Sequence, residues 1–137
     1  MPTKRFTCSF HNLEKIGDYV THYAKQAGLN ETDVYAVQLA VDEASTNIIE
    51  HGYGLECPNR IDITCDIQKD GLKVVIYDDA EPFDLDSIPE PDLNVPLEEL
   101  KPRGLGIFLM RQMMDEVHYQ SSPDKGNTLT MIKHRSK

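Results

Sequence analysis

The sequence predicts an α+β fold, a two-layer sandwich in which helices cover one face of a mostly antiparallel sheet. Two segments in the first half space their apolar residues three or four positions apart, which is typical of amphipathic helices. Two later segments alternate apolar and polar residues on both sides of a turn that contains aspartate and glycine. This second pattern is typical of hairpins with one buried face.

The chain begins with a predicted strand and a predicted helix. Apolar residues alternate with polar ones over residues 6–10, which indicates a strand. Helical spacing follows over residues 13–27. We expect Asn12 to cap the start of this helix and Gly28 to end it, because both residue types are favoured at those positions.

The second helix has the most regular pattern in the chain. Its apolar residues repeat at intervals of three and four over residues 34–48, with Asn30 as a candidate N-cap and Gly52 as a candidate end. Apolar residues then alternate with polar ones over residues 61–67 and 72–76, which predicts the first hairpin.

Residues 79–103 show neither a helical nor an alternating pattern, and they include five prolines and eight acidic residues. A segment of this length inside a compact domain is usually either a functional lid or disordered. Beyond it, residues 104–114 are compatible with a helix that begins in glycines, and residues 117–119 and 129–131 predict a second hairpin. We expect a single domain over residues 1–137.

The composition excludes several classes of protein. The 137 residues include 14 Lys and Arg against 23 Asp and Glu, and the formal net charge of −9 opposes nucleic acid as the main partner. No apolar run reaches the roughly 18 residues of a membrane helix, and the N-terminus does not resemble a signal peptide. We therefore expect a cytoplasmic protein with no membrane partner. The three cysteines lack the spacing of a zinc site, so we expect reduced thiols.

Candidate functional residues lie on the second helix and at the end of the strand before residue 79. Glu43 and Asn47 are four positions apart, so they share one side of the helix. A carboxylate there can activate a hydroxyl and a carboxamide oxygen can bind Mg²⁺, or both residues belong to a solvated helix flank. Asp78 can accept a hydrogen bond from an amine such as that of adenine, or belongs to a solvated acidic turn. His51 faces a ligand or caps the helix.

The run Arg103-Gly104-Leu105-Gly106 follows the irregular segment. Glycines allow the backbone to approach an anion, and the N–H groups at a helix start favour phosphate. The dinucleotide-binding pattern fails here because Leu109 occupies the position of its third glycine, and the sequence contains no GxxxxGK[ST] motif. A nucleotide would therefore bind by neither of those two routes.

Four motifs follow one another along the chain. They are EASTNIIEHGY from Glu43 to Tyr53, Asp78-x-Ala80-x-Pro82-Phe83-Asp84, Arg103-Gly104-Leu105-Gly106, and Gly126-Asn127-Thr128-Leu129. Their order resembles the GHKL ATPase superfamily over nearly the whole chain. Within it, the chain most resembles the RsbW and SpoIIAB type of anti-sigma-factor serine/threonine kinases.

This resemblance implies a Bergerat ATP-binding fold in which residues 79–103 are the ATP lid. It also implies that Glu43 is the catalytic base, that Asn47 binds Mg²⁺, and that Asp78 recognises the adenine amino group. The other motif residues that the resemblance assigns to the nucleotide site are His51, Ala80, Arg103, Gly104, Leu105, Gly106, Asn127 and Thr128.

The chain departs from the family pattern at three positions. Ala80 stands where a glycine usually follows the adenine-reading aspartate, and its methyl group restricts the backbone near the base. Pro102 replaces a glycine that often precedes the phosphate turn, and its fixed φ stiffens one end of the lid. Asn127 occupies a position often held by threonine, and it keeps a hydrogen-bond donor there.

The resemblance implies an ATP- and Mg²⁺-dependent kinase that phosphorylates a small antagonist protein, sequesters a sigma factor and forms a homodimer. An alternative is a non-catalytic, nucleotide-dependent binding module that sequesters a regulatory partner. Two further alternatives are the detached catalytic domain of a two-component histidine kinase and a scaffold that has lost nucleotide binding. Bound nucleotide without a phosphorylated protein would distinguish the binding module from the kinase.

Overall fold

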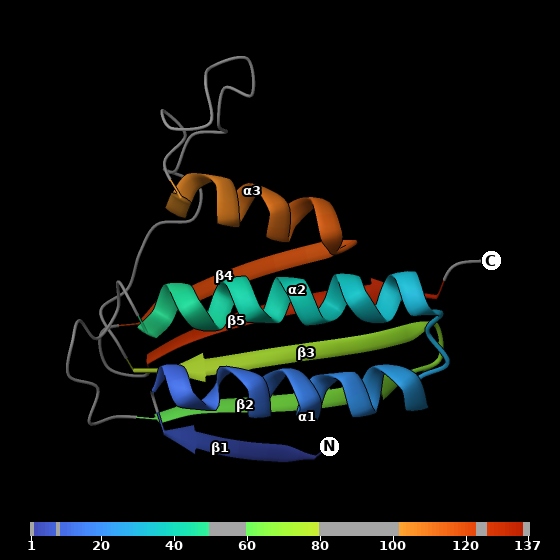
Figure 1. Ribbon diagram of the computed structural model, residues 1–137, viewed down its shortest axis with the longest axis horizontal. Coiled ribbons are helices and arrows are strands. Elements are labelled where there is room, and N and C mark those ends of the chain that lie inside the picture. The colour runs from blue at the N-terminus through green and yellow to red at the C-terminus, as the bar shows by residue number, and fades with distance from the viewer. Residues whose placement is uncertain (1, 8, 50–59, 80–101, 123–125, 136–137) are drawn as a thin grey trace.

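The computed structural model describes residues 2–7, 9–49, 60–79, 102–122 and 126–135. Figure 1 shows the helices and strands that these residues form. In chain order they are β1 (Thr3–Thr7), the 3₁₀ turn η1 (Phe10–Asn12), α1 (Leu13–Gln26), α2 (Glu31–Asn47), β2 (Arg60–Gln68), β3 (Gly71–Asp78), α3 (Pro102–Met113), β4 (Glu116–Ser122) and β5 (Gly126–His134).

The five strands form one sheet in the order β1-β2-β3-β5-β4, and every neighbouring pair is antiparallel. The helices lie on one face of this sheet, with α2 between α1 and α3 (Figure 1). The predicted two-layer α+β architecture is therefore confirmed. Both predicted hairpins are present, as β2–β3 and β4–β5. No helix in the described segments is both long and apolar enough to cross a membrane.

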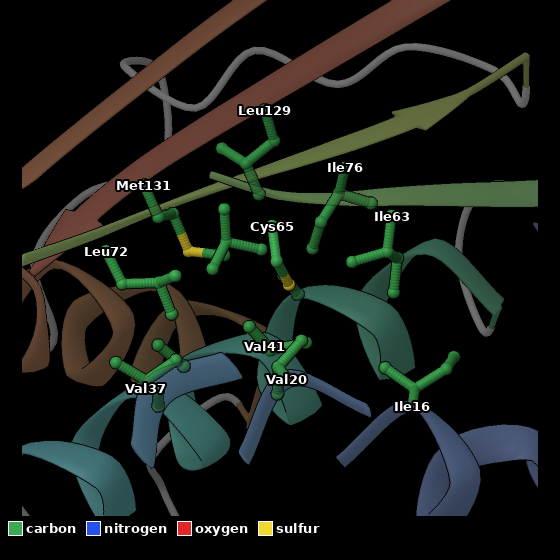
Figure 2. Packing of buried hydrophobic residues seen from close by; sticks show 14 of the residues in the cluster. Ile16, Val20, Val37, Val41, Ile63, Cys65, Leu72, Ile76, Leu129 and Met131 are labelled. Atoms are coloured by element: carbon green, nitrogen blue, oxygen red, sulfur yellow. The ribbon is translucent and has the colours of Figure 1, made fainter. Parts of the chain in front are cut away.

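The hydrophobic core lies between the helices and the sheet. Alternate residues of β2 and β3 point toward the helices, where they meet the apolar stripes of α1 and α2. Burying one such aliphatic side chain stabilises the fold by roughly 1.5–3 kcal/mol. Figure 2 shows side chains of this cluster pointing toward one another from both layers, among them Ile16, Val20, Val37, Val41, Ile63, Cys65, Leu72, Ile76, Leu129 and Met131.

Two helix boundaries follow from the residues that the sequence indicated. The side-chain oxygen of Asn30 accepts a hydrogen bond of 2.8 Å from the backbone N–H of Asp33, so the predicted cap of α2 is confirmed. Gly28 follows α1 with φ +82°, a left-handed conformation that glycine adopts without the steric penalty of a side chain. Gly52, the candidate end of the second helix, lies outside the described residues.

The start of the chain differs from the sequence prediction. The strand β1 ends at Thr7, and Phe10 belongs to η1 with 52% of its surface exposed, so the predicted strand over residues 6–10 is wrong in its second half. Asn12 makes no capping hydrogen bond with α1. Its side-chain amide donates instead to the backbone and side-chain oxygens of Thr7, both at 2.7 Å. A local hydrogen bond to the preceding strand therefore replaces the expected cap.

The helix α3 begins at Pro102, two residues before the expected start. Proline is favoured at the first helical position because an N–H group there would have no partner within the helix, so its absence costs no hydrogen bond. Lys133 of β5 holds the other end of α3, since its ammonium group donates a 2.8 Å hydrogen bond to the carbonyl of Met113. The same group lies 3.9 Å from a carboxylate oxygen of Asp33 in α2. These contacts join both helices to the sheet.

Candidate functional site

Two buried polar residues meet where β3 ends and β5 begins. Asp78 and Asn127 are directly opposite each other in the antiparallel pairing of these strands. The side-chain amide of Asn127 donates a 2.9 Å hydrogen bond to Oδ1 of Asp78. Only 3% of Asp78 and 2% of Asn127 is exposed. A buried carboxylate is costly unless it is hydrogen-bonded, so the hydrogen bond from Asn127 offsets part of the cost of burying Asp78 in a largely apolar layer.

The strand pattern explains why both side chains face the helices. Ile76 precedes Asp78 by two positions and Leu129 follows Asn127 by two, and both apolar residues are buried in the core. Side chains two apart on a strand lie on the same face, so Asp78 and Asn127 also point toward the helical layer. Thr128 lies on the other face for the same reason. The structure thus brings Asn127, and not Thr128, to the Asp78 carboxylate.

Glu43 and Asn47 occupy the side of α2 that faces α3. Gln38 marks the opposite side, because its side chain lies 3.6 Å from where a Cβ atom of Gly17 in α1 would be. At 100° per residue, Glu43 and Asn47 are turned away from Gln38 and toward α3, which packs on the other flank of α2 (Figure 1). Asn47 is 9% exposed, whereas Glu43 is partly exposed. The helix therefore presents a buried carboxamide beside an accessible carboxylate.

Several candidate segments gather at one end of the molecule. Figure 1 shows the end of α2, the end of β3, the start of β5 and the start of α3 at the same end of the two layers. Arg103, Gly104, Leu105 and Gly106 all lie in the first turns of α3. The N–H groups of a helical first turn lack partners within the helix, so this backbone suits an anion. His51 and Ala80 lie outside the described residues.

The donor set of the described residues suits a magnesium ion that is also held by phosphates. No group of three or more His, Cys, Asp or Glu side chains among them is arranged to hold a metal by itself. Mg²⁺ usually takes one or two protein oxygens and completes its octahedron with phosphate oxygens and water. The buried carboxamide of Asn47, at the same end of the molecule as the start of α3, supplies one such oxygen.

Burial raises the pKa of one side chain beside Glu43 and of one thiol in the core. It raises the pKa of Asp42, the residue before Glu43, because the charged carboxylate loses hydration. It raises the pKa of the Cys65 thiol to about 12, so this thiol is protonated and inert at neutral pH. The prediction of a reduced packing thiol is therefore supported at Cys65. Cys8 and Cys57 lie outside the described residues.

Comparison with known proteins identifies the family. Residues 6–133 match the model of the histidine kinase-like ATPase domain family. The chain belongs to this family. The resemblance to the GHKL superfamily that the motifs indicated is thereby confirmed.

Two curated relatives indicate the branch of the histidine kinase-like ATPase family. The chain is 31% identical over 115 residues to the serine-protein kinase RsbW of Bacillus cereus, an alignment that covers 81% of this chain and 70% of the relative. It is 30% identical over 118 residues to the serine-protein kinase RsbW of Halalkalibacterium halodurans, which covers 83% of this chain and 70% of the relative. The chain is thus similar to proteins named as serine-protein kinases.

Two solved structures share the fold. The RsbU and RsbW domains of a Mycobacterium tuberculosis protein align with a TM-score of 0.66 at 15% identity, over 100% of this chain and 33% of that one. The histidine kinase domain of a blue-light activated histidine kinase from Erythrobacter litoralis aligns with a TM-score of 0.54 at 17% identity, over 88% of this chain and 58% of that one. The chain therefore spans about a third of the first protein and somewhat over half of the second.

Sequence reasoning identified Asp78 and Asn127 separately but did not pair them. Each was assigned from its own motif, and the two residues are 49 positions apart. The signal that could have joined them is the pattern of the two hairpins, because each of these residues is a polar residue two positions from an apolar residue of the alternating pattern, Ile76 or Leu129. Pairing those strands in the sheet places the two polar residues opposite each other.

Proposed function

We propose that this chain is an ATP-dependent serine-protein kinase of the RsbW type. In this role it phosphorylates a small antagonist protein and, in its alternate state, sequesters a sigma factor, so that it regulates transcription by exchanging partners. The observation that carries the proposal is the buried Asp78–Asn127 pair, at the same end of the fold as the Glu43 and Asn47 side of α2 and the start of α3. Similarity to proteins named serine-protein kinase RsbW supports it.

The adenine end of the proposed site is the Asp78 carboxylate. A carboxylate only accepts hydrogen bonds when ionised, so it pairs with the exocyclic amine of adenine and not with the carbonyl oxygen of guanine. The Asn127 amide donates to Oδ1 and thereby holds the carboxyl group in one orientation. A buried and oriented acceptor discriminates strongly, because a ligand with a carbonyl oxygen in place of the amine would bring two acceptors together.

The phosphate end of the proposed site is the start of α3. The protein has a net charge of −9, so it can bind an anionic nucleotide only through local donors and cations. The backbone N–H of Gly104 lies in the first turn of α3, where N–H groups lack partners within the helix, and the sequence of this turn includes the positively charged Arg103. Asn47 would hold Mg²⁺, which supplies neutralisation of phosphate charge when bound.

Glu43 is the proposed general base. It accepts the proton of the substrate serine hydroxyl as the serine oxygen forms its bond to the γ-phosphorus, while the bond from that phosphorus to the β-phosphate bridging oxygen breaks and ADP leaves. Phosphoryl transfer depends mainly on positioning and charge neutralisation, so Glu43 contributes less than the groups that bind the phosphates. Its partly exposed position on α2 suits a group that must meet a protein substrate.

Four properties of the family extend the proposal. We propose that the chain is one domain over residues 1–137, that residues 79–103 act as the ATP lid, that the protein works in the cytoplasm, and that it forms a homodimer. None of these rests on a contact among the described residues. The resemblance of the sequence motifs to the RsbW and SpoIIAB type of kinase supports them.

The proposal is tested by measuring nucleotide binding and phosphate transfer in the same variants. Titration calorimetry with MgATP should detect binding by the wild type and loss of at least about tenfold in affinity for Asp78→Ala and Asn47→Ala. Glu43→Gln should bind MgATP within about threefold of wild type but lose roughly a hundredfold or more in transfer from γ-labelled ATP to serine of proteins in an extract of the source organism. Asp42→Asn, beside Glu43 in the chain, is the matched control and should transfer normally.

The outcomes distinguish the proposed kinase from its alternative. Bound ATP with no phosphoserine in any extract protein would contradict the kinase and favour a nucleotide-dependent binding module. Wild-type protein that is folded but binds no MgATP would contradict both. Equal transfer by Glu43→Gln and wild type would remove Glu43 as the base while leaving the kinase intact.

A further inference from the structure

Tyr77 lies behind the Asp78–Asn127 pair, on the opposite face of the sheet. Its neighbours Ile76 and Asp78 are buried on the side that faces the helices. Because side chains alternate along a strand, Tyr77 points to the face without helices, directly through the sheet from the pair. Neither the catalytic base nor the phosphate-binding backbone requires this residue, and no motif of the sequence singled it out.

The ring of Tyr77 packs on a glycine at the start of β5. A Cβ atom on Gly126 would lie 2.6 Å from the Tyr77 hydroxyl oxygen, 2.8 Å from ring atom Cζ and 2.8 Å from the backbone oxygen of Asp78. All three distances are shorter than side-chain contacts allow, so only glycine permits this packing. Gly126 also has φ +84°, which favours glycine independently. The start of β5 is therefore closed onto the end of β3 by direct contact of ring and backbone.

An arginine borders the same ring. The guanidinium carbon of Arg60 lies 5.9 Å from the centre of the Tyr77 ring, a cation–π arrangement. Arg60 donates to Asp62 at 3.2 Å, and Arg5 of β1 donates to the other oxygen of Asp62 at 3.0 Å. The ring of Tyr77 thus lies between Gly126 of β5 and Arg60 of β2. Through Asp62, ion pairs connect Arg60 to Arg5 of β1.

We propose that Tyr77 is a positioning residue that holds Asp78 and Asn127 in register from the opposite face of the sheet, and that it thereby sets the affinity and adenine selectivity of the nucleotide site. The residues adjoining the pair in sequence, Tyr77 on β3 and Gly126 on β5, are the two that contact each other on the far face. A shift of β5 relative to β3 would separate the Asn127 amide from the Asp78 carboxylate. The second half of the proposal rests on the proposed function, whereas the first half concerns the protein without nucleotide.

The test compares three variants at one end of β3. Tyr77→Ala removes the ring, and Tyr77→Phe retains it without the hydroxyl. Val75→Ala is the matched control, because Val75 is a partly buried residue on the same strand and the same face. Its neighbour on β5 is Thr130, which lies away from the Asp78–Asn127 hydrogen bond. Two readouts are measured: hydrogen exchange of the Asn127 side-chain amide by NMR in the nucleotide-free protein, and the Kd for MgATP and MgGTP.

Tyr77→Ala should speed exchange of the Asn127 amide and weaken MgATP binding by about tenfold each, and it should reduce the preference for ATP over GTP. Tyr77→Phe and Val75→Ala should stay within about twofold of wild type in both readouts. Tyr77→Leu keeps apolar bulk without a flat ring and should follow Tyr77→Ala, so it replaces that variant if the alanine protein does not fold.

Unchanged exchange and unchanged Kd in Tyr77→Ala would overturn the inference. Equal effects in Val75→Ala would also overturn it, since they would show general loosening of the sheet. If the wild type binds no MgATP, the proposed function fails and the selectivity half of the inference fails with it. The exchange of Asn127 still decides the positioning half in that case, so the two failures are distinguishable.

Discussion

The hydrogen bond between Asn127 and Asp78 predicts a measurable coupling in the stability of the nucleotide-free protein. The perturbation is a double-mutant cycle of Asp78→Ala, Asn127→Ala and the variant with both changes. Each single variant removes one partner of a 2.9 Å hydrogen bond between side chains that are almost completely buried. The remaining partner then loses this bond in the protein interior, where bulk water does not replace it.

The magnitude follows from the charge of the acceptor and the burial of both groups. Hydrogen bonds to charged groups contribute roughly 1.5–3 kcal/mol, so we expect each single variant to lose about 2 kcal/mol of unfolding free energy. The double variant should lose only slightly more than either single one, because it removes both polar groups of the bond together. The expected coupling free energy is therefore about 2 kcal/mol, within the range known for residues in contact.

Urea unfolding followed by circular dichroism measures this coupling without nucleotide. At a typical denaturant sensitivity of about 2 kcal/mol per molar urea, each single variant should shift the midpoint by about 1 M. A control cycle pairs Asn127→Ala with Asn30→Ala, a cap at the other end of α2, and these two changes should add within about 0.5 kcal/mol. A coupling below about 0.5 kcal/mol between Asp78 and Asn127 would refute the contribution of their hydrogen bond to stability.

Lys133→Met should destabilise the protein by about 2 kcal/mol in the same urea assay, because it removes the donor to the Met113 carbonyl and a cation 3.9 Å from the buried Asp33 carboxylate. The exposed Lys25→Met should change stability by less than about 0.5 kcal/mol. Equal effects of the two lysine variants would contradict this. Burial raises the pKa of Cys65 from 9.0 to about 12, so the folded protein holds this proton more tightly than the unfolded chain does. The contribution of this difference to the unfolding free energy is complete below pH 9 and is lost as the pH rises toward 12. The difference in unfolding free energy between wild type and Cys65→Ala should therefore narrow over this window by up to about 1.4 kcal/mol per pH unit, and a constant difference would contradict the raised pKa.

The helices and both hairpins were predicted correctly, whereas the strand at the start of the chain and the cap of the first helix were not. The helix that contains residues 34–48 and both hairpins follow from periodicity, because burial of one face imposes the same spacing over many residues. Over residues 6–10 the pattern was too short to separate a strand from a turn, and Phe10 became an exposed part of η1. Asn12 had two possible hydrogen-bond partners, and the bond to Thr7 replaced the predicted cap.

The sequence by itself determined which residues share a local element. Glu43 and Asn47 lie on one side of α2 because their spacing matches the helical repeat, and Asp78 ends a strand whose alternate residues are buried. The family could also be inferred from the order of the motifs, since that order does not depend on packing. These properties require only neighbouring residues in the chain.

Only the tertiary structure decided which distant residues meet. Placing β5 beside β3, with β4 outside it, brings Asn127 to Asp78 and turns Thr128 to the other face. The same pairing packs Tyr77 on Gly126 behind the site. The local pattern constrains which face of each strand is buried, but the order of the strands depends on contacts between segments far apart in the chain, so local periodicity alone does not say which strands of the two hairpins become neighbours.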